Sequence, residues 1–134
     1  MRNKSVIIAS ALLIIMIIAI AGNAYYIHTV STGLLDMVFA LPSEYNYINN
    51  LDAQEIENLK SDINKIAAKW EKNARRICAV TRYSDFERVN SQISGLKEYF
   101  FAWNYSEYLA ARKKLIAALE KQKLNEVPNL ENIF

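Results

Sequence analysis

The hydrophobic residues of this chain follow two patterns, an unbroken apolar run near the start and a helical period afterwards. Residues 6–21 are apolar apart from Ser10. As a helix, residues 6–27 are about 33 Å long at 1.5 Å per residue, enough to cross a hydrocarbon core about 30 Å thick. Tyr25 and Tyr26 fall where an aromatic belt is expected at the membrane surface. The run therefore predicts a transmembrane helix that contacts the lipid bilayer through residues 6–27.

A cleaved signal peptide is the alternative interpretation of this run. Arg2 and Lys4 form a basic start, and residues 22–24 (Gly-Asn-Ala) resemble a small-residue cleavage site. The apolar run is longer than the roughly 7–15 residues usual in a signal peptide, and a helical pattern continues beyond it. We therefore predict a retained signal anchor over residues 1–28, followed by a second domain over residues 29–134.

The distribution of positive charge predicts the orientation. No Lys or Arg occurs between Lys4 and Lys60, so the segment after the apolar run carries no charge that would hold it in the cytoplasm. The positive-inside rule then places the short N-terminus in the cytoplasm. We expect a single-pass protein of the cell membrane with an extracytoplasmic domain.

After the apolar run, hydrophobic residues recur at spacings of three and four, which is typical of amphipathic helices. Pro42 should end the first helix near Leu41. Residues 52–55 and 84–87 each read as a capping box that starts a further helix, and Ser106 can cap a fourth, which should fray by Asn125. Residues 129–134 are expected to form a short tail.

The apolar faces of these helices define the predicted core. The second helix contributes Ile56, Leu59, Ile63, Ile66, Trp70 and Ile77, the third Phe86, Val89, Ile93, Leu96, Phe100 and Trp103, and the fourth Tyr108, Leu109, Leu115, Ile116 and Leu119. Short connections favour antiparallel neighbours. The predicted fold class is all-α: an N-terminal transmembrane helix followed by an antiparallel three- to four-helix bundle.

Charge and composition exclude several classes of function. Arg2 and Lys4 account for the whole net charge of +2, so the remaining chain is neutral and lacks the basic surface expected of a nucleic-acid-binding protein. Cys78 is the single cysteine, which excludes an intramolecular disulfide and a multi-cysteine metal site. We expect no nucleic-acid partner, no metal and no cofactor.

Two residues could carry chemistry, and each has a simpler interpretation. His28, the only histidine, falls near the expected membrane surface and is interpreted as an interfacial residue. Cys78 follows the core position Ile77 and has no histidine in the domain's helices to activate it, so a structural thiol is favoured; cross-linking of two subunits is the alternative. We predict no catalytic residues and no enzyme.

Two clusters are candidates for binding. A basic cluster is either a solvated helix face or a contact for anionic lipid or wall polymer; it comprises Lys69, Lys72, Arg75 and Arg76. An aromatic group occupies residues 99–108. Within it, Phe100 and Trp103 are assigned to the core, whereas Phe101 falls off the core stripe and, with Tyr105, is a candidate partner contact.

Several features together resemble one protein family. They are the N-terminal apolar run, Lys-Trp-Glu at residues 69–71, Ser-Asp-Phe-Glu at residues 84–87 and the ending Asn-Leu-Glu-Asn-Ile-Phe. The chain resembles, over nearly its whole length, a family of small membrane-anchored proteins from endospore-forming Gram-positive bacteria, a domain of unknown function. Where that family often has a histidine, this chain has Tyr83. The resemblance implies an envelope location beside a multi-spanning membrane protein, and it brings no catalytic residues.

Two classes of function follow. The first is a membrane-anchored extracytoplasmic interaction module that binds another protein of the membrane or cell envelope. The second is a ligand-binding or sensory bundle with a pocket between its helices.

Overall fold

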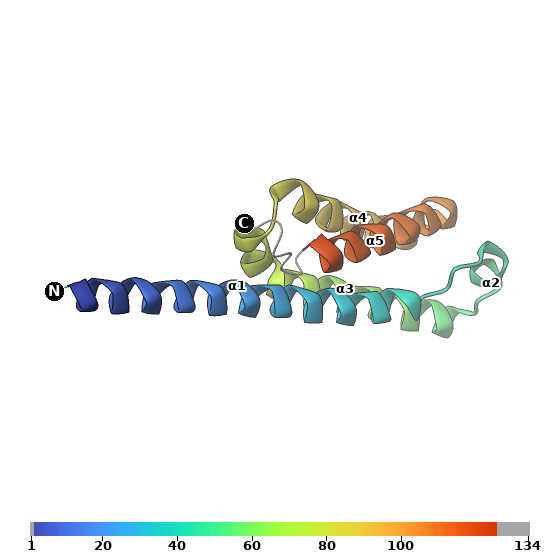
Figure 1. The fold of residues 1–134 in the computed structure, drawn as a ribbon. Coiled ribbons are helices and arrows are strands. Elements are labelled where there is room, and N and C mark those ends of the chain that lie inside the picture. Colours follow the sequence, from blue (N-terminus) through green and yellow to red (C-terminus); the bar gives the residue numbers. More distant parts are fainter. Residues whose placement is uncertain (1, 126–134) are drawn as a thin grey trace.

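A computed structural model describes residues 2–125 of the chain. Within these residues the chain forms five helices and no strand (Figure 1): α1 (Arg2–Phe39), α2 (Tyr45–Asn49), α3 (Ala53–Val80), α4 (Tyr83–Phe101) and α5 (Tyr105–Asn125). The prediction of an all-α protein with a long apolar N-terminal helix and packed helices is confirmed. The tail predicted at residues 129–134 lies outside the described residues.

Helix α1 passes through two environments. Its first part projects alone beyond the other helices (Figure 1), and the side chains of residues 3–22 are exposed on every side. Burial against the bundle begins at Ala24, four residues before the predicted domain boundary, and continues on one face through Ile27, Leu34 and Val38. Among the described residues, this is the one helix long and apolar enough to cross a membrane.

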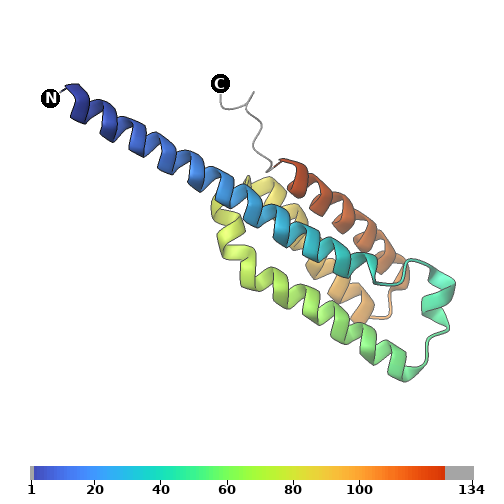
Figure 2. The same ribbon diagram turned by 60° about the horizontal axis from the view of Figure 1, so that its bottom comes forward.

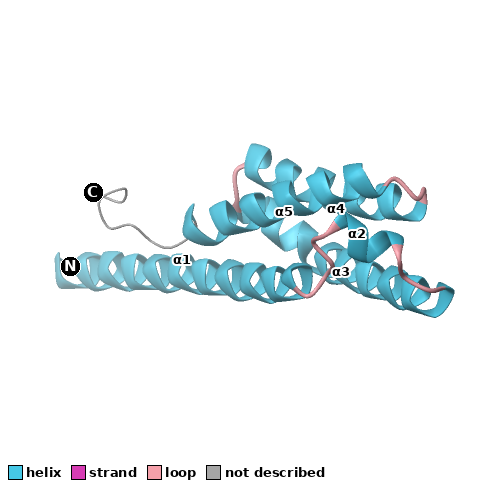
Figure 3. Cartoon of the chain, turned by 90° about the vertical axis from the view of Figure 1, so that its right-hand side faces the viewer, coloured by secondary structure: helices cyan, strands magenta, loops and turns pink. Residues whose placement is uncertain are grey.

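The second part of α1 packs with the three other long helices. Helix α1 contacts α3 and α5, α4 contacts α3 and α5, and the short α2 contacts α5. Successive long helices run in opposite directions, and the connections between them lie at the two ends of the bundle (Figure 2). Figure 3 distinguishes the helices from the loops that join them. One side-chain hydrogen bond connects α5 to α1 inside the apolar interface: Gln122 Nε2 donates to Ser31 Oγ over 2.9 Å.

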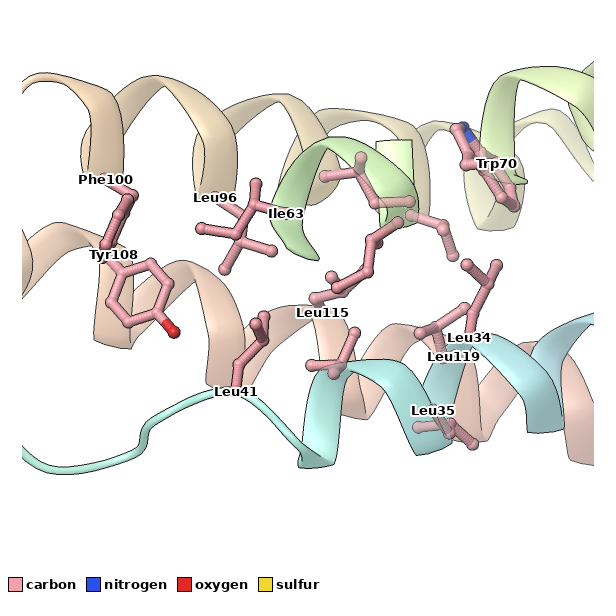
Figure 4. Close-up of a cluster of buried hydrophobic side chains, with 14 of the residues drawn as sticks. Leu34, Leu35, Leu41, Ile63, Trp70, Leu96, Phe100, Tyr108, Leu115 and Leu119 are labelled. Atoms are coloured by element: carbon pink, nitrogen blue, oxygen red, sulfur yellow. The ribbon is translucent and has the colours of Figure 1, made fainter. Parts of the chain in front are cut away.

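The core runs along the bundle axis and includes residues from all five helices (Figure 4). Its largest fully buried side chains are Trp70, Tyr108 and Phe100, which confirms the predicted burial of Trp70 and Phe100. The prediction for Trp103 is wrong, because its side chain is 61% exposed. Helix α4 ends at Phe101, so the helical period that placed Trp103 on the core face no longer applies there.

The start of α3 follows the predicted capping box. The backbone N–H of Glu55 donates to Asp52 Oδ1 over 2.8 Å, and the backbone N–H of Asp52 donates to Glu55 Oε1 over 3.4 Å. These bonds satisfy two amides that the first turn of a helix otherwise leaves without partners.

The other two predicted caps are wrong. Helix α4 starts at Tyr83, one residue before the predicted Ser84 cap, with Arg82 as its N-cap residue. Helix α5 starts at Tyr105, and Asn104 rather than Ser106 accepts the capping bond, from the backbone N–H of Glu107 at 3.4 Å. A four-residue motif cannot show which of several neighbouring polar residues will sit at the helix end, because that depends on where the chain turns.

Candidate interaction surface

The surface feature that stands out lies where α4 turns into α5, at the end of the bundle far from the apolar part of α1. The backbone N–H of Asn104 donates to the carbonyl of Tyr99 over 2.9 Å, and that of Trp103 donates to the carbonyl of Phe100 over 3.2 Å. This pair of bonds is the Schellman helix ending, in which the residue that closes the turn adopts a left-handed conformation. Trp103 is that residue, with φ of 63°.

A tryptophan is an unusual residue at this position. Glycine normally occupies it, because the left-handed conformation brings the Cβ of any other residue against the following carbonyl and costs about 1–2 kcal/mol. Burial of the indole does not offset this strain, because the side chain of Trp103 is 61% exposed. Backbone strain of this kind clusters at functional sites, so Trp103 is the first residue of the candidate surface.

Further aromatic side chains are exposed at this end of the bundle. Tyr45 and Tyr47 of α2 are exposed, and Phe101 is half-buried. Lys60 Nζ lies 5.6 Å from the ring centre of Trp103 and 5.5 Å from that of Phe101, so one cation contacts both rings. We call this surface the tip: Tyr45, Tyr47, Lys60, Phe101 and Trp103.

Tyr105 packs beneath the tip and is not part of its exposed surface. Its side chain is only 8% exposed, and its ring centre lies 6.3 Å from that of Trp103 and 6.5 Å from that of Tyr45. Burial, and then the neighbouring Tyr45, raise the pKa of Tyr105. The predicted partner contact therefore changes: Phe101 is accessible, Tyr105 is covered, and Trp103, which sequence reasoning assigned to the core, is exposed.

The buried hydroxyl of Tyr108 holds the loop between α1 and α2, which leads to Tyr45 and Tyr47. Tyr108 of α5 donates through its hydroxyl to the carbonyl of Pro42 over 3.1 Å, and its ring packs against Phe100 with 5.2 Å between ring centres. Burial raises the pKa of Tyr108 well above its usual value. The chain between α1 and α2 is thereby held on α5, which positions Tyr45 and Tyr47.

A groove runs from the tip along α3 and α4. Its volume is about 430 Å³. Phe101 supplies aromatic surface, the buried ring of Trp70 lies beneath the floor, and the rim carries both signs of charge through Glu71, Lys97 and Glu98. The indole N–H of Trp70 donates to Asn90 Oδ1 over 2.9 Å, so the polar groups at the floor of the groove are paired with each other.

The half of the bundle that contains the tip is acidic. Residues 33–66 and 93–115 carry eight acidic and six basic side chains, and Glu44, Asp52 and Glu55 are among the exposed acids close to α2. An exposed aromatic cluster inside an acidic rim is suited to a partner surface that is apolar at its centre and basic at its edge.

His28 and Cys78 lie apart from the tip. His28 is half-buried on α1 near the entry to the bundle, and Cys78 is a half-buried free thiol in the last turns of α3. Among the described residues, no group of three or more His, Cys, Asp or Glu side chains is placed to hold a metal ion.

Comparison with known proteins gives no relative: no protein-family model, curated protein or solved structure matches this chain.

Proposed function

We propose that this protein is a membrane-anchored helical interaction module, in which an antiparallel four-helix bundle outside the cytoplasm binds another protein of the membrane or cell envelope through the tip. The observation that carries the proposal is Trp103, a strained and exposed tryptophan at a position that favours glycine. Tryptophan is among the residues that contribute most to protein–protein binding energy.

The anchor supports a partner that is itself held at the membrane. Helix α1 continues without a break from its apolar part into the bundle, so the tip is carried at a set distance from the bilayer surface. A multi-spanning membrane protein with an external loop or domain is the class of partner that the resemblance described above implies.

Replacing Trp103 with glycine tests the proposal. Trp103→Gly removes the indole and relieves the left-handed strain, so the bundle should keep its stability or gain up to about 1 kcal/mol. The same variant should lose a stoichiometric membrane-protein partner that co-purifies with the wild-type chain in mild detergent. Tyr83→Ala, which removes an exposed ring at the opposite end, is the matched control and should retain the partner.

The outcome separates a functional residue from a structural one. A variant that loses both stability and partner would show that Trp103 serves the fold. A variant that keeps the partner would exclude the tip as the binding surface.

The orientation has its own test, which uses the single cysteine. In a Cys78→Ala background, a new cysteine replaces the exposed Lys97, and intact cells stripped of any outer barrier are treated with a maleimide that cannot cross membranes. An extracytoplasmic bundle should be labelled as fully before lysis as after it. Labelling only after lysis would place the bundle in the cytoplasm and end the envelope proposal.

The groove between α3 and α4 supports the second candidate, a ligand-binding or sensory bundle. Its aromatic floor and mixed charges are suited to a small amphipathic molecule. A chain that purifies without a protein partner but with a small molecule, released by Phe101→Ala and retained by Trp103→Gly, would favour this function over the interaction module.

A further inference from the structure

The end of the bundle opposite the tip has the opposite charge. Residues 24–32, 67–92 and 116–125, which make up the half nearest the apolar part of α1, carry eight basic and four acidic side chains. The half that contains the tip has six basic and eight acidic side chains. The nearly neutral chain is therefore polarised along the bundle axis.

The position of this basic half relative to the bilayer follows from α1. Residues 6–23 precede the first buried position, Ala24, and as a helix they are about 27 Å long, close to the roughly 30 Å hydrocarbon thickness of a bilayer. A membrane crossed by these residues ends where the bundle begins. The connection between α3 and α4 lies beside α1 at this level (Figure 2).

Contacts between α1 and α3 hold basic side chains at this level. The guanidinium carbon of Arg76 lies 3.8 Å from the ring centre of Tyr26, and the hydroxyl of Tyr26 donates to Asn73 Oδ1. Tyr26 is two residues beyond Ala24, which is about 3 Å along the helix. Arg76 is thereby placed within reach of lipid headgroups.

Three more exposed cations lie close to Arg76 in the chain: Lys72 and Arg75, within four residues of it on α3, and Arg82 in the connection to α4. We call these four residues the basic collar. Among residues 2–125, opposing charge nearby is limited, because the carboxylate of Asp85 is buried and paired with Lys121 Nζ at 3.4 Å. This leaves Glu71 and Glu87 as the exposed acids of α3 and α4 close to the collar. The exposed Tyr25 and Tyr83 add aromatic rings of the kind found at membrane surfaces.

We propose that the basic collar binds the phosphate groups of anionic lipids in the leaflet that the bundle faces, so that the bundle stands on the membrane with its tip directed away from it. The proposal goes beyond partner binding at the tip and requires only that α1 crosses the membrane. Guanidinium groups suit it because they bind phosphate oxygens through two parallel N–H donors.

Lipid binding to the full chain in an uncharged detergent tests the proposal, with native mass spectrometry as the readout. The wild-type chain should bind phosphatidylglycerol at least about 100-fold more tightly than phosphatidylcholine, because at least three basic residues contribute. Each basic residue near a membrane surface strengthens attraction to anionic lipid by about fivefold. The triple variant Arg75→Gln, Arg76→Gln, Arg82→Gln should therefore weaken phosphatidylglycerol binding by about 100-fold, while its thermal melting by circular dichroism shows that the bundle is folded.

A matched control removes the same charge elsewhere. The control variant combines Lys97→Gln, Lys113→Gln and Lys114→Gln, three exposed positions in the acidic half. It should bind phosphatidylglycerol within about twofold of wild type. Equal losses of affinity for phosphatidylglycerol in both variants would show that net charge alone explains the binding, and would overturn the proposal. Equal affinity for the two lipids would also overturn it, and so would displacement of the lipid by inorganic phosphate at the same concentration, which would indicate a free-phosphate site.

Discussion

The two ends of the bundle place their tryptophans in opposite environments. At the collar end, Trp70 is buried and stacks on Phe86 with 5.3 Å between ring centres, and the ring of Tyr26 is covered by Arg76. At the tip, Trp103 and the tyrosines of α2 face outward. Composition alone therefore does not identify the candidate surface, because both ends are rich in aromatic residues and only one leaves its tryptophan exposed.

Truncating each tryptophan should give the largest contrast between the two ends. Trp70→Ala empties a fully buried core site and should destabilise the bundle by about 3–5 kcal/mol, a large part of the stability of a small domain. Trp103→Ala, the matched change at the tip, should cost less than about 0.5 kcal/mol. Urea unfolding of the full chain in mild detergent, followed by circular dichroism, measures both. Equal effects would contradict the assignment of the two rings.

An alkaline titration should test whether the hydroxyl of Tyr108, beneath the tip, is buried. Burial raises the folded-state pKa of Tyr108 above its unfolded value of about 10. The stability associated with its neutral hydroxyl is fully present below pH 10 and falls as the pH rises further, by at most about 1.4 kcal/mol per pH unit for one proton. Tyr108→Phe should lose about 1 kcal/mol at pH 7, where the bond to Pro42 is missing, and should show a shallower decline above pH 10.

The control for that titration is an exposed tyrosine at the other end. Tyr83→Phe should leave the stability at pH 7 unchanged, because the side chain is exposed. If Tyr108→Phe declines as steeply as wild type, the alkaline sensitivity originates elsewhere.

The two ion pairs found among the described residues should give the smallest difference. Asp85 at the collar end is buried and pairs with Lys121, whereas Glu57 near the tip is exposed and pairs with Lys60 at 3.5 Å. Asp85→Asn should cost up to about 1 kcal/mol, and Glu57→Gln a few tenths of a kcal/mol. Thermal melts at low and high salt compare them; a larger loss for Glu57→Gln would reverse the expected order.

Much of the secondary structure could be predicted because it depends on neighbouring residues. The Asp52 capping box needs only residues three apart, and the 3.6-residue period placed Trp70, Ile77 and Phe100 on buried faces. The residues of the candidate surface were harder to predict from such local patterns. Phe101 was identified because it breaks the period, but Trp103 was assigned to the core and Tyr105 to the surface, the reverse of what the structure shows.

The error has a physical cause. A helical period in the sequence gives no sign of where the helix ends unless a glycine or proline interrupts it, and the end of α4 contains neither. Helix α4 stops because the chain must turn so that α5 can pack back along it, and the turn requires a left-handed residue whatever side chain occupies the position. The sequence offered no local signal that this residue would be Trp103.

Composition and spacings of three and four residues are enough to predict an apolar first helix, three further long amphipathic helices and a nearly neutral domain. Tertiary packing sets which part of α1 is buried, since both parts are apolar and burial depends on partners such as Gln122, 91 residues from Ser31. It also decided the charge polarity. Basic residues of α3 and acidic residues near α2 are separated along the bundle only when antiparallel packing brings distant segments to a common end.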